Sequence, residues 1–144
     1  MKPFEEFIKT KDVKRIFPDI ELAKSLVEET ETRIEIALEM KLDDKRARVI
    51  FELLYDSLRE LIDALLALDG YKSYSHEAAI AYLKKFSDFS DFEISSLESF
   101  RKIRIASKYY GKPAKIEEAV RIKEQFQILK EKIIKIINSK LKQK

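Results

Sequence analysis

Residues 45–69 read KRARVIFELLYDSLRELIDALLALD and form the most apolar long segment of the chain. Apolar side chains from Val49 to Leu68 cover most of the circumference of a helix built from this segment. A helix that is apolar nearly all round lies at the centre of a bundle or at an interface. A single bundle of 144 residues has little room to enclose it, so we expect a dimer through this helix or its neighbour.

Glycine and proline mark the ends of the predicted helices. Gly70 directly follows the apolar segment, and Gly111 with Pro113 repeats this stop signal. Pro18 and Asp19 are typical of a helix start. The predicted helices are 19–40, 45–69, 75–86, 93–110 and 115–141, with short turns in 3–16 and no strand. The 19–40 helix has an apolar stripe made of Leu22, Leu26, Ile34 and Leu38.

The composition is typical of one all-α domain over residues 1–144, an up-and-down bundle of four to five helices across 19–141. Only two glycines and three prolines interrupt the chain, and it has no cysteine, which excludes disulfides and thiol nucleophiles. Charges interrupt every apolar run before the roughly 20 residues that a membrane span needs, and the start resembles no secretory signal. We therefore expect a soluble, cytoplasmic protein without membrane contacts.

Charge is distributed unevenly along the chain. Residues 1–100 carry 15 Lys and Arg against 22 Asp and Glu, whereas residues 101–144 carry 14 against 4. The C-terminal part therefore attracts polyanions, and nucleic acid is the usual one. A solvated basic helix, or one that pairs with an acidic neighbour or partner, explains the same charge equally well.

The sequence offers few groups for catalysis. His76 is the only histidine and no Glu-x-x-His pair is present, so we expect neither a metal site nor a cofactor. Ser75 is a predicted helix N-cap, and His76 lies beside tyrosines. A structural hydrogen bond is the expected role of His76, and a direct role in support of the site is the alternative. Asp56, Arg59 and Asp63 share one helix face, either as an ion-pair ladder or as support for a ligand phosphate.

The segment FRKIRIASKYYGKP, residues 100–113, is the main candidate for function. Three of its cations fall on one stripe of a helix at about 100° per residue. Cations in a last helical turn also interact favourably with the helix dipole, which is a purely structural explanation. Adjacent tyrosines offer faces on which bases stack. The candidate contacts to RNA or a nucleotide are Arg101, Arg104, Lys108, Tyr110 and Lys112.

Together with GYKSYSHE at residues 70–77, this segment resembles HEPN domains, in particular their stand-alone archaeal type. The resemblance extends along nearly the whole chain. It implies an up-and-down bundle of four to five helices that forms a homodimer. Members of the family act as metal-independent endoribonucleases or as partners of minimal nucleotidyltransferases in toxin–antitoxin pairs.

The family motif is an arginine, usually followed by Asn or Asp, with a histidine five positions on. Arg104 matches the arginine, Ile105 stands at the polar position, and Tyr109 replaces the histidine. RNA cleavage through the 2′-hydroxyl needs groups that exchange protons near neutrality. Imidazole does this with a pKa of about 6.5, whereas an ordinary phenol has a pKa of about 10. The departure therefore favours phosphate binding by Arg104 over catalysis.

Three functions are open from the sequence. The preferred one is a HEPN-like homodimer that binds RNA or a nucleotide, weak or silent in catalysis, with a minimal nucleotidyltransferase as partner. The second is an active metal-independent RNase in which Arg104, Lys108 and Tyr109 carry out the chemistry. The third is a scaffold dimer whose basic helix binds an acidic protein.

Overall fold

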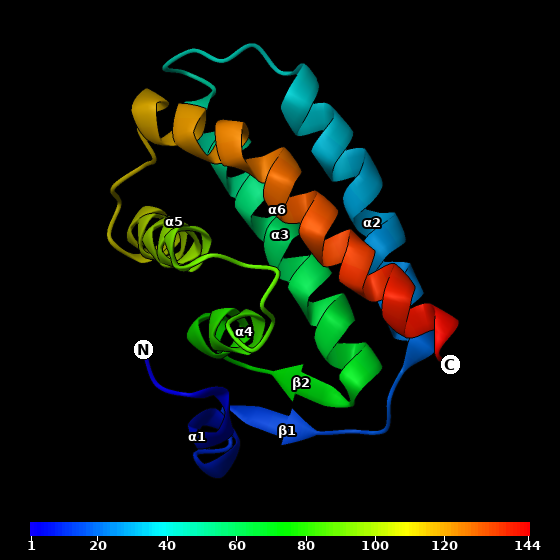
Figure 1. Ribbon diagram of the computed structural model, residues 1–144. Helices are drawn as coiled ribbons and strands as arrows, with labels where there is room; N and C mark the ends of the chain where they lie inside the picture. The colour runs from blue at the N-terminus through cyan, green and yellow to red at the C-terminus, as the bar shows by residue number, and fades with distance from the viewer.

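The computed structural model describes residues 1–144 and is mostly helical, with about 72% of the residues in six α-helices (Figure 1). The predicted all-α class is confirmed at this level. The elements are α1 (Phe4–Lys9), β1 (Val13–Arg15), α2 (Ile20–Glu39), α3 (Ala47–Asp69), β2 (Tyr71–Ser73), α4 (His76–Leu83), α5 (Asp91–Tyr109) and α6 (Ile116–Lys142). None of the helices has both the length and the apolar composition needed to cross a membrane.

Local chemistry sets the helix ends close to where the sequence predicts them. The Asp19 carboxylate accepts a hydrogen bond from the Leu22 N–H at 3.0 Å and caps α2. The Ser75 hydroxyl accepts one from the Ala78 N–H at 3.1 Å and caps α4. Gly70 ends α3 in the left-handed region, with a φ of +82°. These helix starts and stops confirm the predictions for α2, α3 and α4.

Helix α3 packs against both α2 and α6, which lie along its length (Figure 1). Helices α4 and α5 pack against α3 and against each other, and Figure 1 shows them nearly end-on. Side chains from Ile50 to Leu68 on several faces of α3 are fully buried within the single chain. The expectation that one chain has too little room to enclose α3 is therefore wrong, whereas a dimer through this helix or its neighbour stays a prediction.

A two-stranded antiparallel sheet joins the N-terminal segment to the connection between α3 and α4. Val13 pairs with Ser73, and Arg15 pairs with Tyr71. The prediction that the chain contains no strand is wrong here. Three-residue strands are too short to show alternation of apolar and polar residues, and Arg15 and Tyr71 are 56 residues apart in the sequence.

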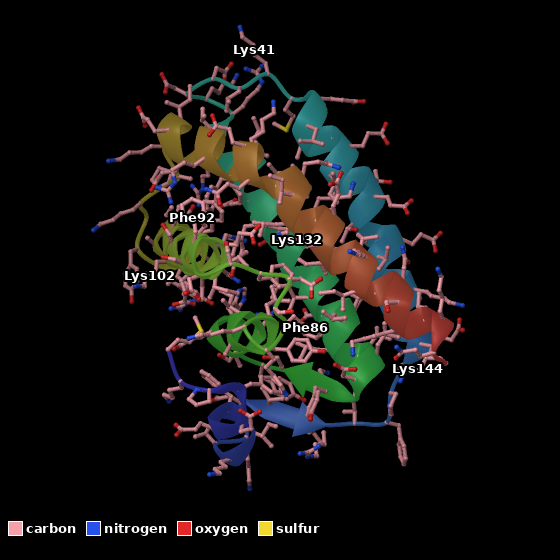
Figure 2. The ribbon with its side chains drawn as sticks, in the orientation of Figure 1. Lys41, Phe86, Phe92, Lys102, Lys132 and Lys144 are labelled. Carbon is pink, nitrogen blue, oxygen red and sulfur yellow. The ribbon has the colours of Figure 1, made fainter.

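An aromatic cluster holds α1 against this sheet and α4. The ring centroid of Phe4 lies 5.1 Å from that of Tyr71 and 5.2 Å from that of Tyr82. The ring centroid of Phe86, a residue labelled beside α4 in Figure 2, lies 5.3 Å from that of Tyr82. The Tyr82 hydroxyl also donates to the carboxylate of Asp69 at the end of α3. The cluster thereby fixes the position of α4, whose first turn borders the candidate site.

Candidate nucleic-acid interface

A surface pocket of about 500 Å³ lies where the start of α4 meets the C-terminal half of α5. Its lining residues are Asp56 from α3, Tyr74, Ser75, His76 and Glu77 at the start of α4, and Arg101, Arg104, Ile105, Lys108 and Tyr109 from α5. The pocket thus brings the cationic stripe of the 100–113 segment together with residues from two other parts of the chain.

Four of the predicted site residues do not line this pocket. Tyr110 and Lys112 are exposed beyond the C-terminal end of α5. Arg59 and Asp63 form an ion pair along α3 at 3.0 Å, and the Arg59 guanidinium also donates to the carbonyl oxygen of Ser73 at 3.1 Å. Arg59 therefore connects α3 to β2, and Asp63 pairs with it within α3.

Arg104 is held by carboxylates of α3. Its Nε and Nη2 donate to the two carboxylate oxygens of Asp56 at 3.0 and 3.2 Å, and its Nη1 lies 3.5 Å from Oε1 of Glu52. The hydrogen bonds to Asp56 raise the pKa of the guanidinium still further, so it stays cationic. Only 18% of the Arg104 side chain is exposed. The guanidinium therefore borders the pocket in a fixed orientation.

The other two cations differ in their partners. The Arg101 guanidinium donates to both carboxylate oxygens of Glu98 at 2.9 and 3.1 Å. Lys108 is the one cation of the pocket that forms no ion pair, and its Nζ lies 5.4 Å from the centroid of the Tyr109 ring. An anion would therefore meet Lys108 without breaking an existing pair.

His76 lines the pocket from the first turn of α4. Its Nδ1 lies 3.1 Å from the hydroxyl oxygen of Tyr55, and the two rings are nearly parallel, with an interplanar angle of 7°. Burial, together with the nearby charges of Arg59, Arg104 and Arg101, lowers the pKa of His76 to about 4. The imidazole is therefore neutral at pH 7. Burial also raises the pKa of Tyr55, so this hydroxyl keeps its proton.

Tyr74 lines the pocket but was not predicted as a site residue. Its side chain is 62% exposed, and Nζ of Lys72 lies 5.4 Å from its ring centroid. Tyr109 is 68% exposed on a different wall of the same pocket. Two exposed aromatic rings therefore border the pocket from separate parts of the chain, and Tyr109 lies beside Lys108 on α5. The tyrosines of the 70–77 segment, close to the only histidine, were the signal available in the sequence.

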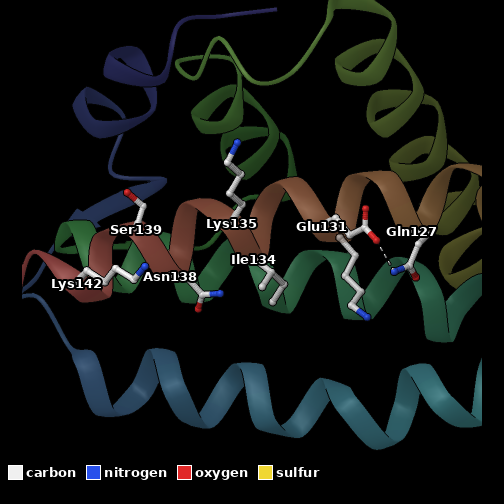
Figure 3. A pocket seen from close by; sticks show the side chains of 8 residues that line it. Gln127, Glu131, Ile134, Lys135, Asn138, Ser139 and Lys142 are labelled. Atoms are coloured by element: carbon white, nitrogen blue, oxygen red, sulfur yellow. Dashed lines mark hydrogen bonds between the residues drawn. The ribbon is translucent and has the colours of Figure 1, made fainter.

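A second concavity, of about 530 Å³, runs along the outer face of α6 (Figure 3). All its lining residues belong to this one helix. In Figure 3, Lys135 and Ser139 point to one side of the helix while Ile134 points to the other. Side chains that diverge cannot enclose a ligand together. The pocket between α4 and α5, with groups from three helices, is the better candidate site.

The fold and the pocket define a mostly helical protein with a surface site of paired arginines, a free lysine and exposed tyrosines. Comparison of the chain with protein-family models, with curated proteins and with solved structures finds no match.

Proposed function

We propose that this protein is a HEPN-like homodimer that binds RNA or a nucleotide and is weak or silent in catalysis. The proposal includes the HEPN-like up-and-down arrangement of the bundle and a minimal nucleotidyltransferase as partner in a toxin–antitoxin-type system. The observation that carries it is the pocket between α4 and α5, where Arg104 lies beside Lys108 and two exposed tyrosines, Tyr74 and Tyr109.

The phosphate contact begins at Lys108, because this cation has no carboxylate partner. Arg104 adds to it, since a guanidinium has five N–H donors and Asp56 accepts from only two of its groups. Hydrogen bonds between charged groups are about twice as strong as neutral ones, and guanidinium matches the geometry of phosphate. The site therefore combines one exposed, unpaired positive charge with one that is held by carboxylates.

Base contacts come from the exposed aromatic side chains. Tyr74 and Tyr109 border the pocket, and Tyr110 with Lys112 extends the surface beyond the end of α5. Stacking of a base on an aromatic side chain is worth about 1–3 kcal/mol and tolerates any sequence. A pocket of about 500 Å³ also lies within the usual size range of small-molecule sites. The contacts fit single-stranded RNA or a single nucleotide.

Weak catalysis is part of the proposal because the one imidazole in the pocket does not exchange protons near pH 7. Tyr109 stands at the histidine position of the family motif. The one imidazole of the chain, His76, has a pKa of about 4. General acid–base catalysis is most effective when the pKa of the group lies near the working pH. We therefore expect the site to bind RNA or a nucleotide rather than to cleave it.

The test measures binding of a labelled single-stranded RNA by fluorescence anisotropy at low and at physiological salt. Lys108→Ala is the test variant, and Lys102→Ala is its control, because Lys102 is exposed on the same helix but does not line the pocket. We expect Lys108→Ala to weaken binding about fivefold to tenfold and to reduce the salt slope by about 1. The control should change affinity less than about twofold.

Equal effects of the two variants, or no RNA binding even at low salt, would overturn the proposal in favour of a scaffold role. RNA cleavage that persists in EDTA and disappears in Arg104→Ala would replace it with the RNase function. Light scattering after gel filtration tests the homodimer, and a monomer at every concentration would remove that part.

A further inference from the structure

We propose that binding of an anion in this pocket is coupled to uptake of a proton by His76, most strongly for a doubly charged anion such as the terminal phosphomonoester of a nucleotide. The inference rests on the proposed function and deepens it. It names the residue that offsets the charge of the ligand.

The charges at the pocket leave a bound anion without full compensation. Arg101, Arg104 and Lys108 carry three positive charges. Asp56 and Glu77 of the lining carry two negative charges, and Glu98 and Glu52, which pair with Arg101 and Arg104, carry two more. A phosphodiester therefore adds one negative charge that the pocket does not balance and a phosphomonoester dianion adds two, and such charges are unfavourable away from bulk water. A proton taken up by a neighbouring base offsets part of this charge.

His76 is the base in the right place. Its Nδ1 is engaged by the Tyr55 hydroxyl, whereas its Nε2 makes no hydrogen bond within the chain. Because Tyr55 keeps its proton and has no other acceptor, the hydroxyl donates to Nδ1 and the neutral ring carries its hydrogen on Nε2. The neutral ring therefore already offers an N–H donor to an anion in the pocket.

Protonation keeps this arrangement intact. The added proton binds to Nδ1, and the Tyr55 hydroxyl turns so that its oxygen accepts a hydrogen bond from Nδ1–H. Nε2–H stays without a partner within the chain and now belongs to a cation. Tyr55 thus supports both protonation states of His76.

The surroundings of His76 explain why the proton arrives only with the ligand. In the free protein, burial and three arginines, Arg59 of α3 and Arg101 and Arg104 of α5, disfavour the imidazolium, and Asp56 opposes them only in part. The other charged or titratable side chains that line the pocket are Tyr74, Glu77, Lys108 and Tyr109. Glu98 and Glu52 pair with Arg101 and Arg104 and reduce the effect of these two arginines. A bound anion reverses the local field, because an opposite charge within ~4–6 Å shifts a pKa by about 1–3 units toward the charged form.

Proton NMR tests this directly, because the chain has one histidine and its Cε1–H signal is unique. Sulfate is the probe, since it stays dianionic over the whole titration and any proton taken up must bind to the protein. We expect a titration midpoint near pH 4 without sulfate and a rise of at least ~1 pH unit with saturating sulfate. Dimethyl phosphate, a diester with one negative charge, should raise the midpoint by less.

Linkage predicts a matching change in affinity. As the pH falls from the raised midpoint of the sulfate-bound protein to the midpoint of the free protein, sulfate should bind up to about tenfold more tightly for each pH unit. His76→Gln cannot take up the proton, so its sulfate affinity should not show this rise. Lys102→Ala, outside the pocket, should behave like the unmodified chain.

The outcomes separate this inference from the function on which it rests. Sulfate binding that is lost in Lys108→Ala but leaves the His76 midpoint unmoved overturns the inference and leaves RNA binding standing. Absence of saturable sulfate binding at every pH also overturns it. Absence of RNA binding, with a His76 midpoint that moves with sulfate, overturns RNA binding and supports the pocket as a site for small dianions.

Discussion

Both carboxylate oxygens of Asp56 accept hydrogen bonds from the Arg104 guanidinium, at 3.0 and 3.2 Å, across the contact between α3 and α5. The pair orients the arginine that we propose as the phosphate-binding residue of the HEPN-like motif. Two of the donor groups of Arg104 are therefore occupied by Asp56, and the negative charge of Asp56 offsets the positive charge that a ligand would meet. The Asp56 carboxylate therefore limits the affinity of the pocket for anions.

Asp56→Asn should raise affinity for single-stranded RNA by about threefold to tenfold, because it removes a negative charge beside the ligand and frees Arg104. The Asp56 side chain is 40% exposed, so the loss of the pair should cost about 1 kcal/mol or less of stability. Fluorescence anisotropy measures the affinity. Asp63→Asn is the control, because Asp63 also pairs with an arginine, Arg59, but does not line the pocket. Weaker binding by Asp56→Asn would contradict the prediction.

His76 should make the stability of the fold depend on pH. Its pKa is about 4 in the folded chain against 6.5 for an ordinary histidine, so the unfolded state binds more protons between these values. The free energy of unfolding therefore falls as the pH drops through this window and levels off below it. We expect about 1–2 kcal/mol, discounted for solvent screening of a partly exposed ring.

Urea denaturation at several pH values, compared between the unmodified chain and His76→Gln, isolates this contribution. The two proteins differ only at residue 76, so the difference between the two curves measures the contribution of His76. A difference that does not change with pH would show that the imidazole is not held neutral in the fold.

Gly70→Ala should destabilise the fold by about 2–3 kcal/mol, through backbone strain and a steric clash. Gly70 has a φ of +82°, and an added Cβ would lie 2.8 Å from the carbonyl oxygen of Ile16. Gly111→Ala is the matched control, because Gly111 has a φ of +62° but nothing within 4 Å of an added Cβ. It should cost only about 1 kcal/mol. Thermal unfolding gives both values, and equal costs would exclude the clash at Gly70.

Tyr82→Phe should cost about 1.5–3 kcal/mol, the usual value for a hydrogen bond to a charged group. The Tyr82 side chain is buried, and its hydroxyl donates to Asp69, which also pairs with Nζ of Lys140 at 2.8 Å. Tyr110→Phe removes a hydroxyl from a residue that is 72% exposed and should change stability by less than ~0.5 kcal/mol. Chemical denaturation of the two variants provides the comparison, and similar midpoints would contradict the prediction.

The helix ends were predictable because they depend on neighbouring residues. The Asp19 and Ser75 caps and the stop at Gly70 each act within a few positions of the chain. The buried face of α2 was harder to predict. Leu22 and Leu38 of the predicted apolar stripe are 42% and 38% exposed. Small residues between the predicted stripe positions are buried in their place, because close approach of α2 to α3 requires small side chains.

Two of these small residues, Ala23 and Ala37, are fully buried in α2. Their burial depends on the distance between two helix axes, and no periodicity of large apolar residues encodes that distance. An amphipathic pattern therefore indicates that a helix has a buried side, but it locates that side only roughly.

The candidate site was predictable only along its own helix. Helical periodicity placed Arg101, Arg104 and Lys108 on one stripe, and all three line the pocket. Their partners come from distant parts of the chain, and Asp56 is 48 residues from Arg104. Local sequence therefore could not show that carboxylates offset much of the expected positive charge, or that His76 lines the same pocket.

The pairing of β1 with β2 has a consequence for synthesis of the chain on the ribosome. Val13 is made 60 residues before its partner Ser73. At a translation rate of ~5–20 residues per second, β1 therefore has no partner strand for about 3–12 s. The start of α4 takes its place only afterwards, since the Tyr74 N–H donates to the carbonyl oxygen of Asp12 at 2.8 Å. A nascent chain halted within α3 therefore leaves Phe4 and Phe7, buried in the finished fold, open to a chaperone.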